Sequence, residues 1–251
     1  MLKEIIIAIQ SYFKAHQFIR ENRLWKWILI PGFIYAILFI VSMYFFGKSA
    51  NNVIEWIKNV THLTVWLERM QSSFLSFLFA ISGLILWLVL MLFYFSLFKY
   101  LWLILGSPVF AYLSEKTTSI LEQRDFPFSL RQLAHDIIRG VRIALRNTLW
   151  QTIYIISIVI LSFIPLVGWA MPMVAMFLEC FYYGFSMMDY TCERQKMSAS
   201  DSIYFINNHR GLAIGNGLIF YMMHLVPIIG WVFAPAYAVI AATLSLREEK
   251  A

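Results

Sequence analysis

The chain has 251 residues, of which 61% are hydrophobic and only 14% are charged, and its formal net charge is +6. Soluble domains carry about 25% charged residues, so this composition excludes an ordinary soluble protein. Four long runs are nearly free of charged residues, and each is long enough for a membrane-spanning helix, which needs roughly 20 apolar residues. The sequence therefore predicts an all-α integral membrane protein.

The first third of the chain predicts a surface helix followed by two spans. Residues 1–22 mix apolar residues with Lys and Arg, which indicates an amphipathic helix on the membrane surface. Residues 24–46 predict the first transmembrane helix, and residues 48–72, where polar and apolar residues mix, predict an external loop with amphipathic helices. Residues 74–105 predict a second span, which must tilt because it exceeds the length of a perpendicular crossing.

Residues 107–147 predict helices on the cytoplasmic side. Ser107 is a favourable N-cap and Pro108 suits a first helical position, so a new helix is predicted to begin there. The pattern from Ser129 to Gln132 has the form of a capping box and predicts the start of another helix. One face of that helix carries a basic stripe, formed by Arg131, His135, Arg139, Arg142 and Arg146. The stripe fits a helix lying against anionic lipid, and it fits an electropositive approach for an anionic solute.

Two similar phrases, IPLVGWAMP at 164–172 and VPIIGWVFAP at 226–235, interrupt the last two apolar runs. These runs occupy 148–189 and 212–246, and a polar connector at 190–211 joins them. Because Pro interrupts a helix, a turn at the second phrase leaves arms of about 15 and 11 residues, roughly 22 and 16 Å long. Such arms cannot cross a hydrocarbon core of about 30 Å. We therefore predict two re-entrant hairpins inserted from the cytoplasm; the first has longer arms, and full spanning stays open for it.

Ionisable groups inside the apolar runs are functional candidates by default. Glu179 lies in the first hairpin and His224 near the second tip. The alternative is structural for both: a hydrogen-bonded carboxyl at a helix contact, and a satisfied core histidine. Cys180 and Cys192 have no partners at metal-ligand spacing, and no catalytic motif occurs. We expect reduced thiols, no metal, no cofactor and no enzymatic activity.

Basic residues are distributed unevenly along the chain. The predicted external loop contains three of them, namely Lys48, Lys58 and Arg69, and the others fall mainly in segments assigned to the opposite side. The positive-inside rule then predicts that both termini are cytoplasmic. These segments account for the net positive charge, so we expect no nucleic-acid partner. Asp189 is expected to pair with Arg194 or Arg210 in the connector.

The order of several segments resembles the bacterial CysZ sulfate-transporter family, which belongs with the wider etoposide-induced protein family. The resemblance rests on the stretches 22–31, 106–123, 162–190, 207–220 and 226–246. Its best marks are the two Gly-Trp phrases and the dipeptide Asp189-Tyr190. The resemblance implies two full-length spanning helices, two pairs of hemi-penetrating helices, and a homo-oligomer in the bacterial inner membrane. It also implies sulfate uptake toward cysteine synthesis.

That family has a Gly-aliphatic-Arg-Arg motif before its first span, which is linked to sulfate. Matching at Ile30-Pro31 places Arg23, Leu24, Trp25 and Lys26 on the motif. Arg23 stands in place of the glycine, and Lys26 retains a positive charge without the guanidinium fork. The resemblance implies that Arg23 and Lys26 hold the anion at the head of the helix. The alternative function is a non-transporting membrane protein that organises lipid or a partner protein.

Overall fold

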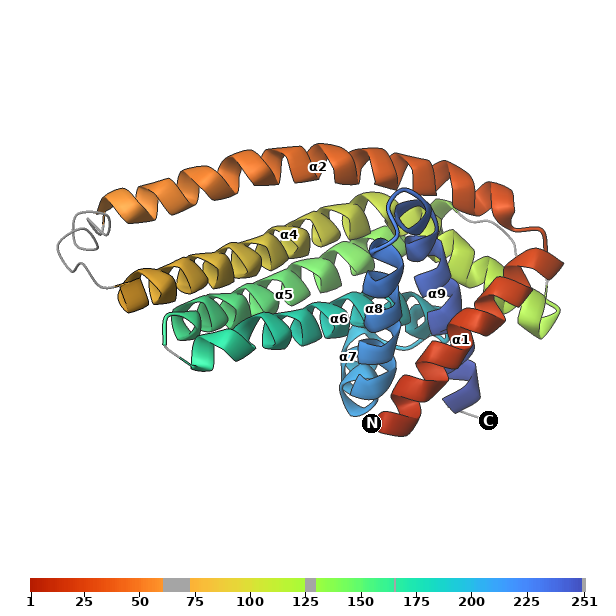
Figure 1. The fold of residues 1–251 in the computed structure, drawn as a ribbon. Coiled ribbons are helices and arrows are strands. Elements are labelled where there is room, and N and C mark those ends of the chain that lie inside the picture. Colours follow the sequence, from red (N-terminus) through yellow and green to blue (C-terminus); the bar gives the residue numbers. More distant parts are fainter. Residues whose placement is uncertain (61–72, 125–129, 165, 250–251) are drawn as a thin grey trace.

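The computed structural model describes residues 1–60, 73–124, 130–164 and 166–249 (Figure 1). Every regular element in these ranges is a helix, which confirms the all-α class. The helices are α1 Leu2–Glu21, α2 Trp25–Val60, α4 Ser73–Glu122, α5 Leu130–Ser162, α6 Val167–Arg194, α7 Ala199–Asn208, α8 Arg210–His224 and α9 Ile229–Glu249. Among the described residues, the stretches long and apolar enough to cross a membrane are Trp25–Ala50, Ile138–Ser162 and Ile229–Glu248.

The helices form two sets that cross each other. Figure 1 shows α2, α4, α5 and α6 running lengthwise, while α1, α8 and α9 run across them. Helix α9 packs against α1, α2, α4, α6 and α8, and 78% of its apolar window is buried, against 28% for α2. Helix α9 is therefore surrounded by protein, whereas α2 exposes side chains such as Phe33 and Ile37 to the lipid expected around it.

Two predicted helix boundaries are wrong. Helix α2 continues past Phe46 to Val60, because one exposed glycine, Gly47, costs about 1 kcal/mol and does not end a helix. The rest of the predicted external loop, 61–72, lies outside the described residues.

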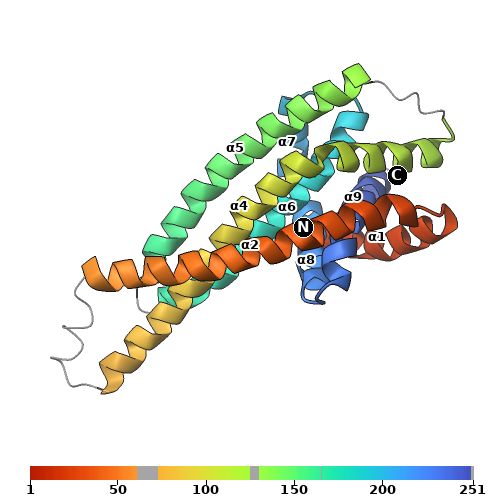
Figure 2. The ribbon, with the colours of Figure 1, turned by 90° about the horizontal axis from the view of Figure 1, so that it is seen from above.

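Helix α4 likewise runs through Pro108, where the sequence predicts a new start. Pro108 lacks the N–H that would bond to the carbonyl of Ile104, and the Ser107 hydroxyl donates to that carbonyl instead, at 2.9 Å. Figures 1 and 2 show α4 changing direction in its last third, where its colour turns from yellow to green. The pair Ser107-Pro108 therefore bends a helix that it was predicted to begin.

Helix α5 unites two segments that the sequence analysis divides near residue 147. It carries the basic stripe in its first half and forms the first hairpin arm in its second half. Its predicted cap, Ser129, lies outside the described residues. The apolar part, Ile138–Ser162, has 25 residues and at 1.5 Å per residue measures about 37 Å. It is therefore long enough for the first hairpin to span, which the sequence leaves open.

The two Gly-Trp phrases fold into similar turns. Leu166 and Ile228 occupy equivalent positions, and both have a positive φ, 69° and 63°. The residue after each begins the second arm of its hairpin, α6 or α9. Pro165, in the first phrase, lies outside the described residues. The shared φ reverses the chain direction within a few residues.

Glycine is required in both turns by a close backbone approach. A Cβ on Gly168 would lie 2.2 Å from the carbonyl oxygen of Ser162, and one on Gly230 would lie 1.7 Å from that of Met223. Each glycine N–H also donates to the carbonyl four residues back, at 2.8 and 2.9 Å. The repeated phrase is therefore the sequence of a tight helical-hairpin tip.

The arms of the second hairpin are unequal. Helix α8 has 15 residues, as predicted, whereas α9 has 21 instead of about 11. The prediction for α9 is wrong because Pro235 lies inside the helix and does not interrupt it. At 1.5 Å per residue α8 measures about 22 Å, less than the hydrocarbon thickness, so the hairpin retains one short arm.

Candidate functional site

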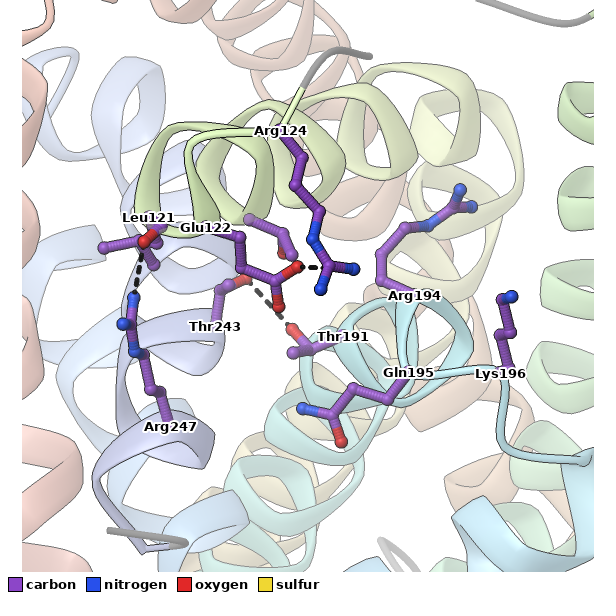
Figure 3. A pocket seen from close by; sticks show the side chains of 10 residues that line it. Leu121, Glu122, Arg124, Thr191, Arg194, Gln195, Lys196, Thr243 and Arg247 are labelled. Carbon is purple, nitrogen blue, oxygen red and sulfur yellow. Dashed lines mark hydrogen bonds and ion pairs between the residues drawn. The ribbon is translucent and has the colours of Figure 1, made fainter. Parts of the chain in front are cut away.

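A basic pocket of about 430 Å³ lies where the C-terminal ends of α4, α6 and α9 come together (Figure 3). Four cationic side chains from these helix ends and the residues just beyond them line it: Arg124, Arg194, Lys196 and Arg247. One lining carboxylate, Glu122, lies 3.5 Å from Arg124. The pocket is therefore positively charged and open to an anion.

Hydroxyl groups form the base of this basic pocket. A hydrogen bond of 3.0 Å, drawn as a dashed line in Figure 3, joins the hydroxyls of Thr191 and Thr243. Behind the lining residues, the Ser114 hydroxyl lies 3.5 and 3.4 Å from them. The three residues come from α6, α9 and α4, and all are nearly completely buried. The Thr243 hydroxyl donates its single hydrogen to the carbonyl of Val239 at 3.0 Å and therefore accepts from Thr191. The cationic side chains are thus the groups that supply the donors an oxyanion requires.

The four cations differ in the ion pairs and hydrogen bonds that they form with other groups of the protein. Arg194 forms a 2.7 Å ion pair with Glu115, and Arg247 donates to the carbonyl of Leu121 at 3.2 Å, near the end of α4. Basic side chains at helix C-termini offset the unpaired carbonyls there, so these two also stabilise the helix ends. Lys196 is exposed and makes no side-chain bond within the described part of the chain. Lys196 is therefore the lining charge most available to a ligand.

Sequence reasoning missed this pocket because its residues come from three segments far apart in the chain. A single basic residue near a helix C-terminus is common, because it offsets the negative end of the helix dipole, and does not by itself indicate a binding site. The available signal was the recurrence of such residues after three separate apolar helices. Their convergence depends on how the helices pack.

Arg23 and Lys26, the expected anion ligands, lie at the junction of α1 and α2. Both are exposed, and neither side chain bonds to another described residue. The ring centroids of Trp27 and Tyr112 are 4.5 Å apart, which places the start of α2 against the last third of α4. Figures 1 and 2 show this junction and the C-terminal end of α4 at the same end of the molecule. Arg23 and Lys26 therefore share an end with the basic pocket without lining it.

The basic stripe of α5 is divided by its surroundings. Arg142 and His135 are exposed, whereas Arg146 is half-buried and donates to the Asn147 amide oxygen at 3.0 Å. Arg131 lies in α5, but its side chain is outside the described part of the structure. The described members of the stripe therefore do not present one uniform charged surface.

Arg139 differs most from the other stripe residues because acidic groups enclose it. Its guanidinium lies 3.0 Å from Asp189 and 3.8 Å from Glu193, and the side chain is only 10% exposed. The expected pairing of Asp189 with Arg194 or Arg210 is wrong, because α5 packs against α6 and brings Arg139 to Asp189 first. Arg139 thus joins helices instead of facing an approaching anion.

Glu179 and His224 are both engaged inside the protein. The Glu179 carboxylate accepts from Gln151 at 2.5 Å and from the Tyr221 hydroxyl at 2.9 Å. His224 Nδ1 lies 3.3 Å from the carbonyl of Phe220, which only accepts, so Nδ1 donates and Nε2 accepts from Tyr35 at 2.8 Å. These contacts match the structural alternative for each residue. Among the residues that the structure describes, no group of three or more His, Cys, Asp or Glu side chains could hold a metal ion.

Comparison with known proteins gives matches along most of the chain. A family model described as Sulfate transporter CysZ/Etoposide-induced protein 2.4 matches residues 11–235. A protein of Pseudomonas fluorescens (strain Pf0-1) named sulfate transporter CysZ is 26% identical over 228 residues, covering 89% of this chain and 86% of that protein. A protein of the same name from Pseudomonas aeruginosa (strain LESB58) is 27% identical over 191 residues, covering 73% and 77%. The matched range of the family model includes both hairpin tips and the junction that carries Arg23 and Lys26.

Proposed function

The chain belongs to the family of the sulfate transporter CysZ and etoposide-induced protein 2.4, and from this premise we propose that it carries sulfate across a bacterial inner membrane. The family name describes a transporter and not an enzyme. Uptake would deliver sulfate to the cytoplasm, where cysteine synthesis consumes it. In this proposal the protein is a homo-oligomer that crosses the membrane several times, with both termini in the cytoplasm.

The basic pocket is the observation that carries the proposal. It brings several cations together at the end of the molecule where α4, α6 and α9 finish. Cationic N–H groups suit sulfate, because it carries two negative charges and many acceptor lone pairs. Under the positive-inside rule this end faces the cytoplasm, so the pocket would receive the anion on its way out of the membrane.

Arg23 and Lys26 would supply a second electropositive contact at the same end. Both charges are exposed and unengaged within the described residues, so they remain available to a diffusing anion. Arg142, also exposed, would add to the attractive field. The engaged side chains Arg139 and Glu179 would instead hold the surrounding helices in place.

The test is uptake of radiolabelled sulfate into liposomes that contain the purified protein. Flux above that of empty liposomes is expected, and Lys26→Gln and Lys196→Gln should each lower it several-fold. Lys48→Gln is the matched control, because Lys48 is an exposed lysine toward the opposite end of α2. It should leave the flux unchanged.

Folding is monitored by size-exclusion chromatography and by the Tm in detergent. Absence of flux with monodisperse, folded protein would overturn the proposal and favour the non-transporting alternative. Equal losses in Lys26→Gln and Lys48→Gln would show that a general charge effect, and not an anion site, controls the rate. Phosphate, molybdate and chloride measured in parallel identify the preferred anion.

A further inference from the structure

A second cavity, of about 370 Å³, opens between α5, α6 and the α7–α8 junction. One wall is apolar and comes mainly from α6: Val174, Phe177, Leu178 and Phe181. Their spacing of three and four residues places them on one face of that helix. Val174 and Phe177 are 42% and 48% exposed, so the wall opens toward the outside of the protein. On an apolar helix of a membrane protein, that outside is lipid.

The other end of this cavity is polar and cationic. Arg210 begins α8, Asn207 lies in the last turn of α7, and both line the cavity together with Tyr182. Arg146 of α5 is close enough to act electrostatically on the Tyr182 hydroxyl. No carboxylate is among the described lining residues. Arg210 Nε donates to the carbonyl of Asn207 at 3.0 Å, and the Glu4 carboxylate, outside the lining, accepts from the N–H of Gly211 at 2.8 Å.

The apolar and polar ends follow the long axis of the first hairpin. The bond between Gln151 and Glu179 fixes the register of α5 against α6. In that register Val174 lies toward the tip and Tyr182 toward the base, where α7 and α8 pack. Exposed aromatic residues occur at this base, including Trp150 and Tyr204, as they do at the headgroup level of membrane proteins.

We propose that this cavity binds one anionic phospholipid, with its phosphate at Arg210 and Tyr182 and an acyl chain along the α6 wall. An amphipathic cavity matches an amphipathic ligand, and Arg210, the charged residue of the described lining, selects a negatively charged headgroup. A free anion would use the polar end alone and leave the apolar wall without a ligand. The inference does not depend on sulfate transport, because it concerns a cavity separate from the basic pocket.

Native mass spectrometry of the delipidated full-length protein tests the proposal. The protein is titrated with phosphatidylglycerol or with phosphatidylcholine that has the same acyl chains. One phosphatidylglycerol adduct should saturate first, and Arg210→Gln should weaken it about fivefold, since one surface cation contributes about 1 kcal/mol to anionic-lipid binding. Arg210→Lys, which keeps the charge, should retain most of the binding. Arg20→Gln is the matched control, because Arg20 is an exposed arginine of α1 outside the cavity.

A second variant tests the acyl-chain part of the cavity. Leu178→Trp fills the space beside the wall and should weaken the adduct with Arg210 intact. Equal affinity for the two lipids, or an unchanged adduct in Arg210→Gln, would overturn the proposal. Inorganic sulfate and phosphate form the third arm of the experiment. A free-anion site would be indicated if they bound through Arg210 while Leu178→Trp had no effect on phosphatidylglycerol.

Discussion

Arg139 of α5 and Asp189 of α6 form a 3.0 Å ion pair in which the side chains are only 10% and 5% exposed. Arg139 also donates to the carbonyl of Met197, and the Ser202 hydroxyl donates to the same Asp189 oxygen that Arg139 contacts. The pair therefore joins the two arms of the first hairpin and the start of the connector. A buried charge that loses its partner keeps its desolvation cost, so this contact is expected to be sensitive to mutation.

We expect Arg139→Gln to destabilise the protein by about 3–5 kcal/mol, because it leaves Asp189 buried without its cation. Arg142→Gln is the matched control on the same helix, since Arg142 is exposed; its change should stay within about 0.5 kcal/mol. Unfolding by SDS titration in mixed micelles measures the free energies. Similar free energies for both variants would mean that the ion pair contributes nothing to stability.

Gly230→Ala should destabilise the second hairpin by about 3 kcal/mol, because the new Cβ would meet the carbonyl oxygen of Met223. Gly168→Ala should also destabilise its hairpin, since a Cβ there would meet the carbonyl oxygen of Ser162. Gly47→Ala is the control: nothing lies within 4 Å of a Cβ there, and the substitution should stabilise α2 by about 0.5–1 kcal/mol. The Tm in detergent reports all three. A Tm of Gly230→Ala at or above wild type would contradict the assigned turn.

Arg23 has a φ of 53°, in the region that favours glycine. It occupies the position at which the Gly-aliphatic-Arg-Arg motif of the CysZ family has its glycine. Arg23→Gly should therefore be about 1 kcal/mol more stable than Arg23→Ala, since a Cβ is unfavourable in this conformation. Both variants remove the charge and should lower sulfate flux equally. A flux that instead followed the difference in Tm would assign Arg23 a backbone role without an anion-binding one.

Cysteine labelling measures the depth of the hairpin tips in a background where Cys180 and Cys192, both buried, are replaced by alanine. Leu225→Cys, at the second tip, should resist an impermeant maleimide added outside, because α8 measures only about 22 Å. Val53→Cys, toward the far end of α2, should be labelled readily. Rapid labelling of Leu225→Cys would mean that the second hairpin reaches the outer surface.

The same labelling experiment decides whether the first hairpin spans. Figure 1 shows its tip pointing toward the end of the molecule where α2 finishes and α4 begins. Its first arm is long enough to cross, and Leu166 at the tip is 78% exposed. We therefore expect Leu166→Cys to be labelled from outside, unlike Leu225→Cys. Protection of both tips would make both hairpins re-entrant.

Several features could be read from the sequence because they depend on local patterns. Long apolar runs predict membrane helices whatever the surrounding fold, and the family resemblance, which the family match confirms, rests on the order of those runs. Pro and Gly at fixed spacing mark both hairpin tips, since their backbone preferences act within a few residues. Local patterns were less reliable at Pro108 and Pro235, where a helix continues through the proline.

The sequence by itself determined that this is a helical membrane protein, where its chain reverses, and the family to which it belongs. Only the tertiary structure decided that Asp189 pairs with Arg139 and that three helix ends form a basic pocket. It also decided that the two hairpin tips have different surroundings. Near the second tip Trp231 packs against Phe39, with ring centroids 4.8 Å apart, whereas Trp169 near the first is 57% exposed. Backbone turns follow from neighbouring residues, but the partner of a side chain depends on which helix packs beside it.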